Sequence, residues 1–423
     1  MVHFARPVTL KLWMKFYFLL LFLFLQVLGI SQTRSLDYFV EQAHTNSPVI
    51  NEFNNQILSN RLDSLILRAS LKTQVNFISS NSYAPVIKGF GYDNVITNGA
   101  NITGVVQASR NFLTKNNVAA ELNAIRLQSQ ALFDTINITG QELTRAITEQ
   151  YITAYGNQVA LDFNGEIYDL LKKEEEILKT LTQKSVYKQT DYLAFYVTLQ
   201  QQQFAFLQSQ IQYNADYLTL SYLAGMVDTT ISRVERPNLD DSLRLDFVNS
   251  IFYKRFTTDS LRLEAEKRLI DFQYKPRLGA YTDAGYNSSL LTTPYKNFGV
   301  SFGVSLNVPI YDGNQKRYKY NKIDLLEKTR LNKKTFYIHQ YRQQIAQFSL
   351  QLKSTDLLVN TINAQIKYIN TLLSANAKLL ETGDIKISDY VLAITNYINA
   401  RNLLNQNYIN RLRIVNQIRY WNR

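Results

Sequence analysis

Residues 297–314, NFGVSFGVSLNVPIYDGN, contain the pattern that most restricts the fold of this 423-residue chain. The strict alternation of apolar and small polar residues predicts a β-strand over 297–310. In a soluble antiparallel sheet the second face commonly carries charged side chains. Here that face carries only Gly, Ser, Asn and Pro, which suits a wall around water with the apolar face turned to lipid. The alternate apolar residues are Phe298, Val300, Phe302, Val304, Leu306, Val308 and Ile310.

Three further segments, about 74–84, 101–112 and 277–288, also read as strands. Each is about ten residues long, the length that crosses a bilayer at a tilt. Four strands cannot close a barrel, and open strand edges are not tolerated in lipid. The pattern therefore predicts an oligomer, and three copies would supply twelve strands around a lumen.

Long helices are predicted after each pair of strands. No proline lies between Pro85 and Pro237 or after Pro309, and proline in a helix interior is strongly unfavourable. From Ile338 to Leu373, apolar residues recur at alternating steps of three and four, the repeat of a coiled-coil seam. We expect long helices at about 114–182 and 313–380, and shorter ones at about 188–224 and 386–421. Helices at about 35–70 and 240–274 precede the strand pairs.

This order of elements occurs twice, and local sequence echoes support a duplication. KQTDY at 188–192 matches KISDY at 386–390, and TGVVQASRNF at 103–112 overlays FGVSLNVPIY at 302–311. The offsets, about 198 and 199 residues, are nearly equal. We therefore predict two repeats, 32–237 and 238–423.

The N-terminus predicts export. Arg6, Lys11 and Lys15 precede an apolar run of about a dozen residues and then small residues, which is typical of a signal peptide over 1–31. An uncleaved N-terminal anchor is the alternative. No later segment is long and apolar enough for a spanning helix, so contact with a membrane would use strands.

Composition excludes several functions. The chain has no cysteine, and its three histidines are not clustered, so no thiol chemistry or metal site is expected. No phosphate-binding glycine loop or catalytic set is present, which predicts no cofactor and no enzyme. The net charge of +12 becomes +9 once Arg6, Lys11 and Lys15 are removed, but the basic residues are scattered and do not predict nucleic-acid binding. The charged run KKEEEILK at 172–179 is predicted to be a solvated helix face.

Together with the export signal and the duplication, three motifs resemble the TolC family of outer-membrane efflux channels: VPIYDGNQ, FQYKPRLGAYTDAGY and ETGDIKISDYVLA. The resemblance covers nearly all of the mature chain. It implies an α+β membrane protein whose homotrimer forms a twelve-stranded outer-membrane β-barrel, continuing into a periplasmic α-helical coiled-coil tunnel. It also implies docking to a periplasmic adaptor and an inner-membrane RND or ABC transporter. The complex would be a tripartite efflux pump or type I secretion system, with passive export of drugs, metals or polypeptides.

The resemblance assigns Asp389 to the periplasmic constriction of the tunnel. Threefold symmetry would place three carboxylates around one axis, where they would attract cations and gate the tunnel. A local alternative, compatible with the first, makes Asp389 a helix N-cap. Some family members carry a second aspartate where this chain has Leu392, so the ring would be single. Asp191 would help to hold the closed state, but Ile385 occupies the place of its basic partner and Lys386 follows.

Two further groups of residues are candidate functional positions. The hairpin tips at about 182–190 and 380–388 would dock the adaptor, although plain solvated turns are the simpler interpretation. The candidate tip residues are Ser185, Lys188, Gly383 and Asp384. Asp312 is predicted to cap the second long helix, and Gly313 to relax the backbone where strand becomes helix. The alternative function is a secreted or surface coiled-coil protein without a pore, which leaves the alternating strands unexplained.

Overall fold

The computed structural model describes residues 33–92, 100–239, 247, 250–290 and 293–422, so the predicted signal peptide lies outside the described residues. The chain forms two compact units. We call the residues up to Ser47, Gly140–Arg244 and Gln343–Arg423 the hairpin unit. Pro48–Thr139 and Leu245–Arg342 form the sheet unit. The chain is mostly helical with one small sheet, and each unit contains parts of both sequence repeats.

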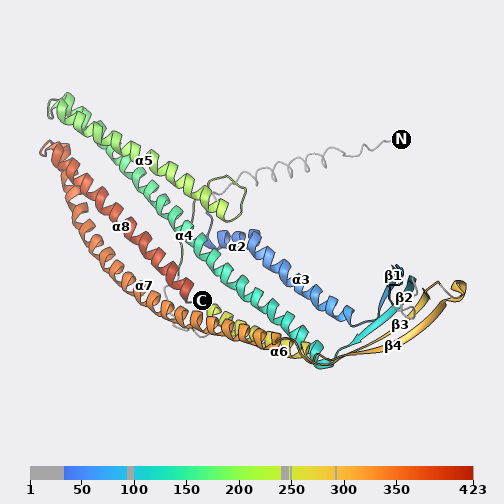
Figure 1. Ribbon diagram of the computed structural model, residues 1–423. Coiled ribbons are helices and arrows are strands. Elements are labelled where there is room, and N and C mark those ends of the chain that lie inside the picture. Colours follow the sequence, from blue (N-terminus) through green and yellow to red (C-terminus); the bar gives the residue numbers. More distant parts are fainter. Residues whose placement is uncertain (1–32, 93–99, 240–246, 248–249, 291–292, 423) are drawn as a thin grey trace, which may run out of the picture. The chain divides into compact units, whose positions relative to one another are not determined.

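The sheet unit contains four antiparallel strands in the order β1-β2-β3-β4 (Figure 1). Strands of the two predicted repeats meet where β2 pairs with β3. The expected strand over 297–310 is shorter than predicted, because β4 ends at Asn307. Pro309 follows, and proline has no N–H to donate to a strand partner. The strands are β1 (Gln74–Tyr83), β2 (Ala100–Phe112), β3 (Arg277–Ser288) and β4 (Phe298–Asn307).

The register sorts the strand side chains onto two chemically different faces. One row crosses all four strands through Phe77, Val106, Ala284 and Val300 and is entirely apolar. The next row, one residue along each strand, contains Asn76, Gln107, Asp283 and Ser301. Because successive strand residues point to opposite faces, the sheet has one mainly apolar face and one mainly polar face. We call them the apolar and the polar face, although Thr282 and Arg110 lie on the first and Ile78 and Val105 on the second.

Helices flank the sheet in the sheet unit. α3 (Pro48–Ser70) precedes β1, and α6 (Ile251–Gln273) precedes β3. The single helix expected over 35–70 is wrong: α2 (Leu36–Asn46) ends before Ser47, which is extended, because the following Pro48 disfavours helical backbone at that position. The helix expected from about 240 begins only at Ile251, where the Ser250 hydroxyl accepts from the Tyr253 N–H at 3.2 Å. Residues 240–246 and 248–249 of that expectation lie outside the described residues.

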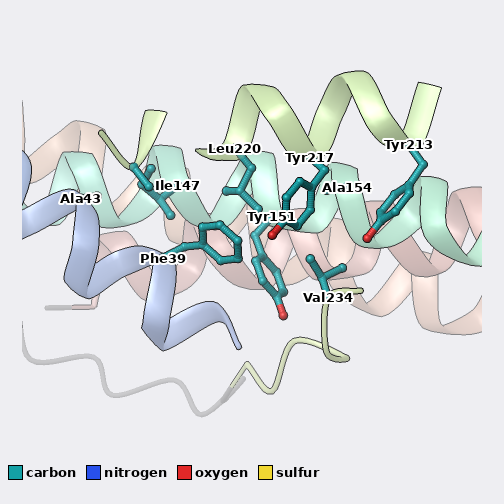
Figure 2. Packing of buried hydrophobic residues seen from close by; sticks show 10 residues of the cluster. Phe39, Ala43, Ile147, Tyr151, Ala154, Tyr213, Tyr217, Leu220 and Val234 are labelled. Carbon is teal, nitrogen blue, oxygen red and sulfur yellow. The ribbon is translucent and has the colours of Figure 1, made fainter. Parts of the chain in front are cut away.

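The hairpin unit contains two helical hairpins. α4 (Lys115–Gln183) turns into α5 (Gln189–Leu223), and α7 (Gln315–Thr382) turns into α8 (Ile387–Trp421), close to the expected ranges. The N-terminal α2 closes one part of the core, where Phe39 packs edge-on against Tyr151 of α4 and Tyr217 of α5 (Figure 2). Among the described helices, none combines the length and apolar character needed to cross a membrane.

The transition from β4 to α7 depends on a side-chain cap. Gly313 and Asn314 adopt positive φ angles of 65° and 67°, and α7 begins at Gln315. The Asp312 carboxylate accepts from the Lys316 N–H at 2.7 Å. It therefore satisfies one of the amide groups that have no partner inside the helix, from a position ahead of the usual N-cap.

We predict that Asp312→Ala lowers the urea midpoint of the detergent-solubilised protein, because the first turn of α7 loses this acceptor. Asp312→Asn should retain most of the effect, since an amide oxygen also caps. Circular dichroism at 222 nm measures the midpoint. The matched control is Asp324→Ala, whose carboxylate makes only a long contact of 3.5 Å to exposed Lys267. Equal losses for Asp312→Ala and Asp324→Ala would contradict the capping role.

Candidate functional site: the ends of the two helical hairpins

The two hairpins end in turns of the same geometry. In the first, the Ser185 and Val186 amides donate to the carbonyls of Thr182 and Leu181, each at 2.9 Å. In the second, the amides of Gly383 and Asp384 donate to Leu380 at 3.2 Å and Leu379 at 2.9 Å. These are Schellman motifs, which close a helix with a residue at positive φ.

The residue at positive φ differs between the two turns. Ser185 has φ 62° and Gly383 has φ 81°. A side chain costs energy in this region, so the first turn is locally less favourable than the second. At Gly383 a second constraint applies, because an added Cβ would lie 2.6 Å from the Val186 Cγ1 atom. The two tips therefore touch, and the Tyr187 hydroxyl also lies 3.4 Å from the Leu380 carbonyl of the other hairpin.

The two candidate aspartates occupy equivalent positions in the first turns of α5 and α8. Lys188 and Lys386 are the N-cap residues, and neither side chain makes a capping hydrogen bond. The amides of Asp191 and Asp389 donate to the carbonyls of Lys188 and Lys386, each at 3.0 Å. The N-cap interpretation of Asp389 is therefore wrong, because Asp389 is the third residue of α8. A carboxylate there still favours the helix through the dipole of the first turn.

The structure leaves these charges exposed at the hairpin ends. Asp389, Lys386, Lys188 and Asp384 are exposed, and Asp191 is half-buried. Within the described part of one chain, no ion pair joins Asp191, Lys386 or Asp389 to another residue. The same described residues contain no group of three or more His, Asp and Glu placed to hold a metal ion.

Just inside the tips, an apolar cluster joins the two hairpins. Phe195 of α5 stacks on Tyr390 of α8 with the ring centroids 6.4 Å apart and the planes 8° from parallel. Leu178 of α4 and Leu380 of α7 are fully buried in the same cluster. The close packing of large side chains makes this cluster the main contact between the hairpins at their ends.

A carboxylate, Glu174 of α4, lies in this contact. Its Oε2 atom and the Tyr390 hydroxyl are both buried, and neither makes a hydrogen bond of normal geometry. The two groups are nevertheless close enough to influence each other's pKa. Burial raises the pKa of Glu174; the adjacent Tyr390 hydroxyl opposes this shift, whereas the charge of Glu381 adds to it. The expectation of a solvated face over 172–179 is therefore wrong for Glu174 and Leu178. The spacing of Leu171, Glu174 and Leu178, three and then four residues, is the signal that could have placed Glu174 in the seam.

The neighbouring residue Glu175, unlike Glu174, accepts a hydrogen bond of normal geometry. The Tyr192 hydroxyl of α5 donates to Glu175 Oε1 at 2.6 Å. This bond holds the proton on Tyr192 and, with burial, raises its pKa to about 12. Tyr192 and Tyr390 are 198 positions apart and thus equivalent in the duplication. Tyr192 donates a short hydrogen bond to its carboxylate neighbour, whereas Tyr390 lies beside Glu174 without a hydrogen bond of normal geometry.

The arrangement of elements is shared with solved outer-membrane channels. CusC, from a study of its folding and transmembrane channel formation, superimposes with a TM-score of 0.71 at 11% identity, covering 91% of each chain. The Campylobacter jejuni outer-membrane channel CmeC gives 0.69 at 13% identity, covering 92% of this chain and 85% of that one. The open state of the Neisseria gonorrhoeae channel MtrE gives 0.69 at 12%, covering 91% and 88%. Neither a protein-family model nor a curated protein matches the sequence.

These similarities define a class at the level of the fold. The chain has the fold of bacterial outer-membrane channels. More particularly, the fold is that of the TolC family, as the sequence motifs predicted, and it extends over about nine-tenths of the chain.

We predict that Glu174→Gln raises the thermal midpoint of the protein at pH 8, because a neutral amide avoids the cost of a buried charge. The pKa of Glu174 is raised in the folded state, so the wild-type loses stability as the pH rises above the ordinary value of 4.5. Below pH 4.5 the carboxyl is protonated in both states, and the difference between the variant and wild-type should vanish. Differential scanning fluorimetry at pH 4 and pH 8 measures both midpoints.

Glu175→Gln is the matched control for Glu174→Gln. It is the adjacent residue, but its carboxylate accepts a short hydrogen bond, so its replacement should lower the midpoint at pH 8. If both variants shift the midpoint in the same direction, Glu174 is not an unfavourable buried charge.

Proposed function

We propose that this chain is the outer-membrane component of an export machine, a passive duct from the periplasm to the exterior that performs no catalysis. The single observation that carries the proposal is the sheet with one apolar and one polar face in a chain with the fold of outer-membrane channels. Several features of the described residues support individual parts of this proposal.

The apolar face of the sheet fits lipid. Within the chain, Val300 is 82% and Phe302 90% exposed, and apolar side chains also project from the neighbouring strands. Soluble monomers rarely leave so continuous an apolar surface in water. A bilayer would cover it, because outward apolar and inward polar residues alternate in transmembrane strands.

The edges of the sheet support assembly into a ring. β1 and β4 each pair on one side only within the described chain. Their free N–H and C=O groups would be costly in lipid, where no water can satisfy them. Pairing β4 of one copy with β1 of the next satisfies every edge only if the ring closes. Three copies would close a barrel of twelve strands, with the polar face lining the lumen.

A second surface, in the hairpin unit, also supports contact between copies. α5 buries Phe195, Leu199 and Tyr213 on one side. The opposite side carries exposed apolar residues every seven positions: Val197, Phe204, Ile211 and Leu218. A heptad stripe of this kind is the seam by which helices pack in coiled coils. We therefore assign it to a helix of a neighbouring copy in a periplasmic tunnel.

At the hairpin ends, three copies would bring three Asp389 carboxylates around the axis of the trimer. Such a ring would attract cations and influence how readily ions pass through the closed end of the tunnel. Asp191 and Lys386 would pair between neighbouring copies, since neither makes an ion pair within the described chain. The exposed tips, with Ser185, Lys188, Gly383 and Asp384, would contact the periplasmic adaptor. The adaptor would link the duct to an inner-membrane RND or ABC transporter.

The membrane assignment predicts opposite outcomes for two adjacent substitutions. Phe302→Arg places a charge on the apolar face and should lower the stability of the membrane-inserted state by about 2–4 kcal/mol. Ser301→Arg places the same charge on the polar face and should be tolerated. Outer-membrane yield after expression with the native signal, and resistance to urea extraction, measure insertion.

Recovery of the wild-type with soluble periplasmic proteins would favour the surface coiled-coil alternative. Equal tolerance of Phe302→Arg and Ser301→Arg would show that the apolar face does not contact lipid.

The seam on α5 predicts a loss of assembly. The double variant Phe204→Asp, Ile211→Asp would bury charges between copies, which is costly without partners. We expect trimers in mild detergent to fall at least tenfold in abundance, as measured by native mass spectrometry. Gln203→Asp is the control, because residue 203 is exposed on the flank of α5, outside the apolar stripe. Intact trimers in the double variant would exclude this stripe from the interface.

A further inference from the structure

We infer that Asp283 of β3 forms a second cation-favouring ring, inside the barrel and separate from Asp389, and that it sets the charge preference of the outer duct. This inference rests on the proposed function, because it requires that the polar face line a lumen. It assigns a specificity-determining role to a residue that the sequence analysis did not single out.

The position of Asp283 follows from the strand register. Asp283 pairs with Gln107 on β2 and with Ser301 on β4, and Gln107 pairs with Asn76 on β1. These four side chains form one polar row across the whole sheet. The Ser301 hydroxyl donates to Asp283 Oδ1 at 2.8 Å, which fixes the carboxylate on the polar face. Three copies would turn the row into a belt of twelve polar side chains with three evenly spaced carboxylates.

No other charged residue of the described strands lies on the polar face near Asp283. The four strands contain only three charged residues: Arg110, Arg277 and Asp283. Arg110 belongs to the apolar face, and its Nε atom donates to the Leu71 carbonyl at 3.2 Å, so it does not reach the polar face. Arg277 pairs with Asn307 at the helix end of the sheet. It lies six residues from Asp283, or about 20 Å along a strand.

The radius of the barrel, compared with the Debye length, determines the salt concentration at which the three carboxylates influence ions in the lumen. Twelve tilted strands about 4.8 Å apart give a backbone radius of about 12 Å. The Debye length is about 30 Å at 0.01 M salt and about 3 Å at 1 M. The carboxylates would therefore act across much of the lumen at low salt, and only on their immediate neighbours at high salt. A charge preference that disappears with salt is the expected signature.

The absence of native cysteine allows a direct test. Gln107→Cys places a single reporter thiol in the same row as Asp283, and Val106→Cys places one on the apolar face. The full-length protein in outer-membrane vesicles is treated with a cationic or an anionic methanethiosulfonate of similar size, and the two labelling rates are compared. The second background carries Asp283→Asn, which keeps an acceptor for Ser301.

We expect the ratio of cationic to anionic labelling at position 107 to fall about fivefold in Asp283→Asn at 0.01 M salt, and less than twofold at 1 M. Arg277→Gln, at the far end of the strand, should change the ratio far less than Asp283→Asn. An unchanged ratio in Asp283→Asn, with position 107 readily labelled, would overturn the inference alone. Equal labelling of positions 106 and 107 would instead contradict the lumen itself, and with it the proposed function.

Discussion

The free edges of a four-stranded sheet are the constraint on which the rest of the proposed structure depends. A strand edge in water can bond to solvent, but an edge in lipid cannot. In the proposed channel the apolar face would contact lipid, so the chain would enter the membrane only when β1 and β4 pair with strands of other copies. Assembly and membrane insertion would then be one process. The same closure would bring helices of neighbouring copies together, and the exposed apolar stripe of α5 is the surface that we assign to such a contact.

The two predicted repeats contain turns with the same backbone geometry but different side chains. The Schellman turns at Ser185 and Gly383 are 198 positions apart, as are Tyr192 and Tyr390. The second turn holds the glycine and contacts Val186 of the first. The second tyrosine is buried against a carboxylate, whereas the first donates a hydrogen bond to one. The two hairpins therefore share their backbone geometry but differ in the contacts of the turn residue and of the equivalent tyrosine.

The sequence predicted most elements because their signals are local. Alternation located the strands, and the heptad spacing located the long helices within one or two residues. The alternation of apolar residues does not mark the end of β4, because Pro309 interrupts hydrogen bonding without interrupting the alternation. The break between α2 and α3 follows from Pro48, which disfavours helical backbone at Ser47. The pairing of β2 with β3 depends on residues about 180 positions apart, which no local pattern encodes. The charged run at 172–179 predicts solvent exposure for Glu174, whereas the spacing of Glu174 from Leu171 and Leu178 places it in the seam.

The buried carboxylate bears on how a closed duct could open. A seam packed only with apolar side chains would be difficult to separate, since each large buried side chain contributes about 1.5–3 kcal/mol. Glu174 opposes that packing when it is ionised, because burial, together with the nearby Glu381, disfavours its charge more than the Tyr390 hydroxyl favours it. Separation of α4 from α8 would return the carboxylate to water and recover part of the cost. Ionisation of Glu174 therefore opposes the contact between the hairpins at the end that we propose contacts a periplasmic partner. In the proposed duct, a partner that opens the closed end would have to separate this seam, and the ionised carboxylate of Glu174 would lower the free energy that the separation requires.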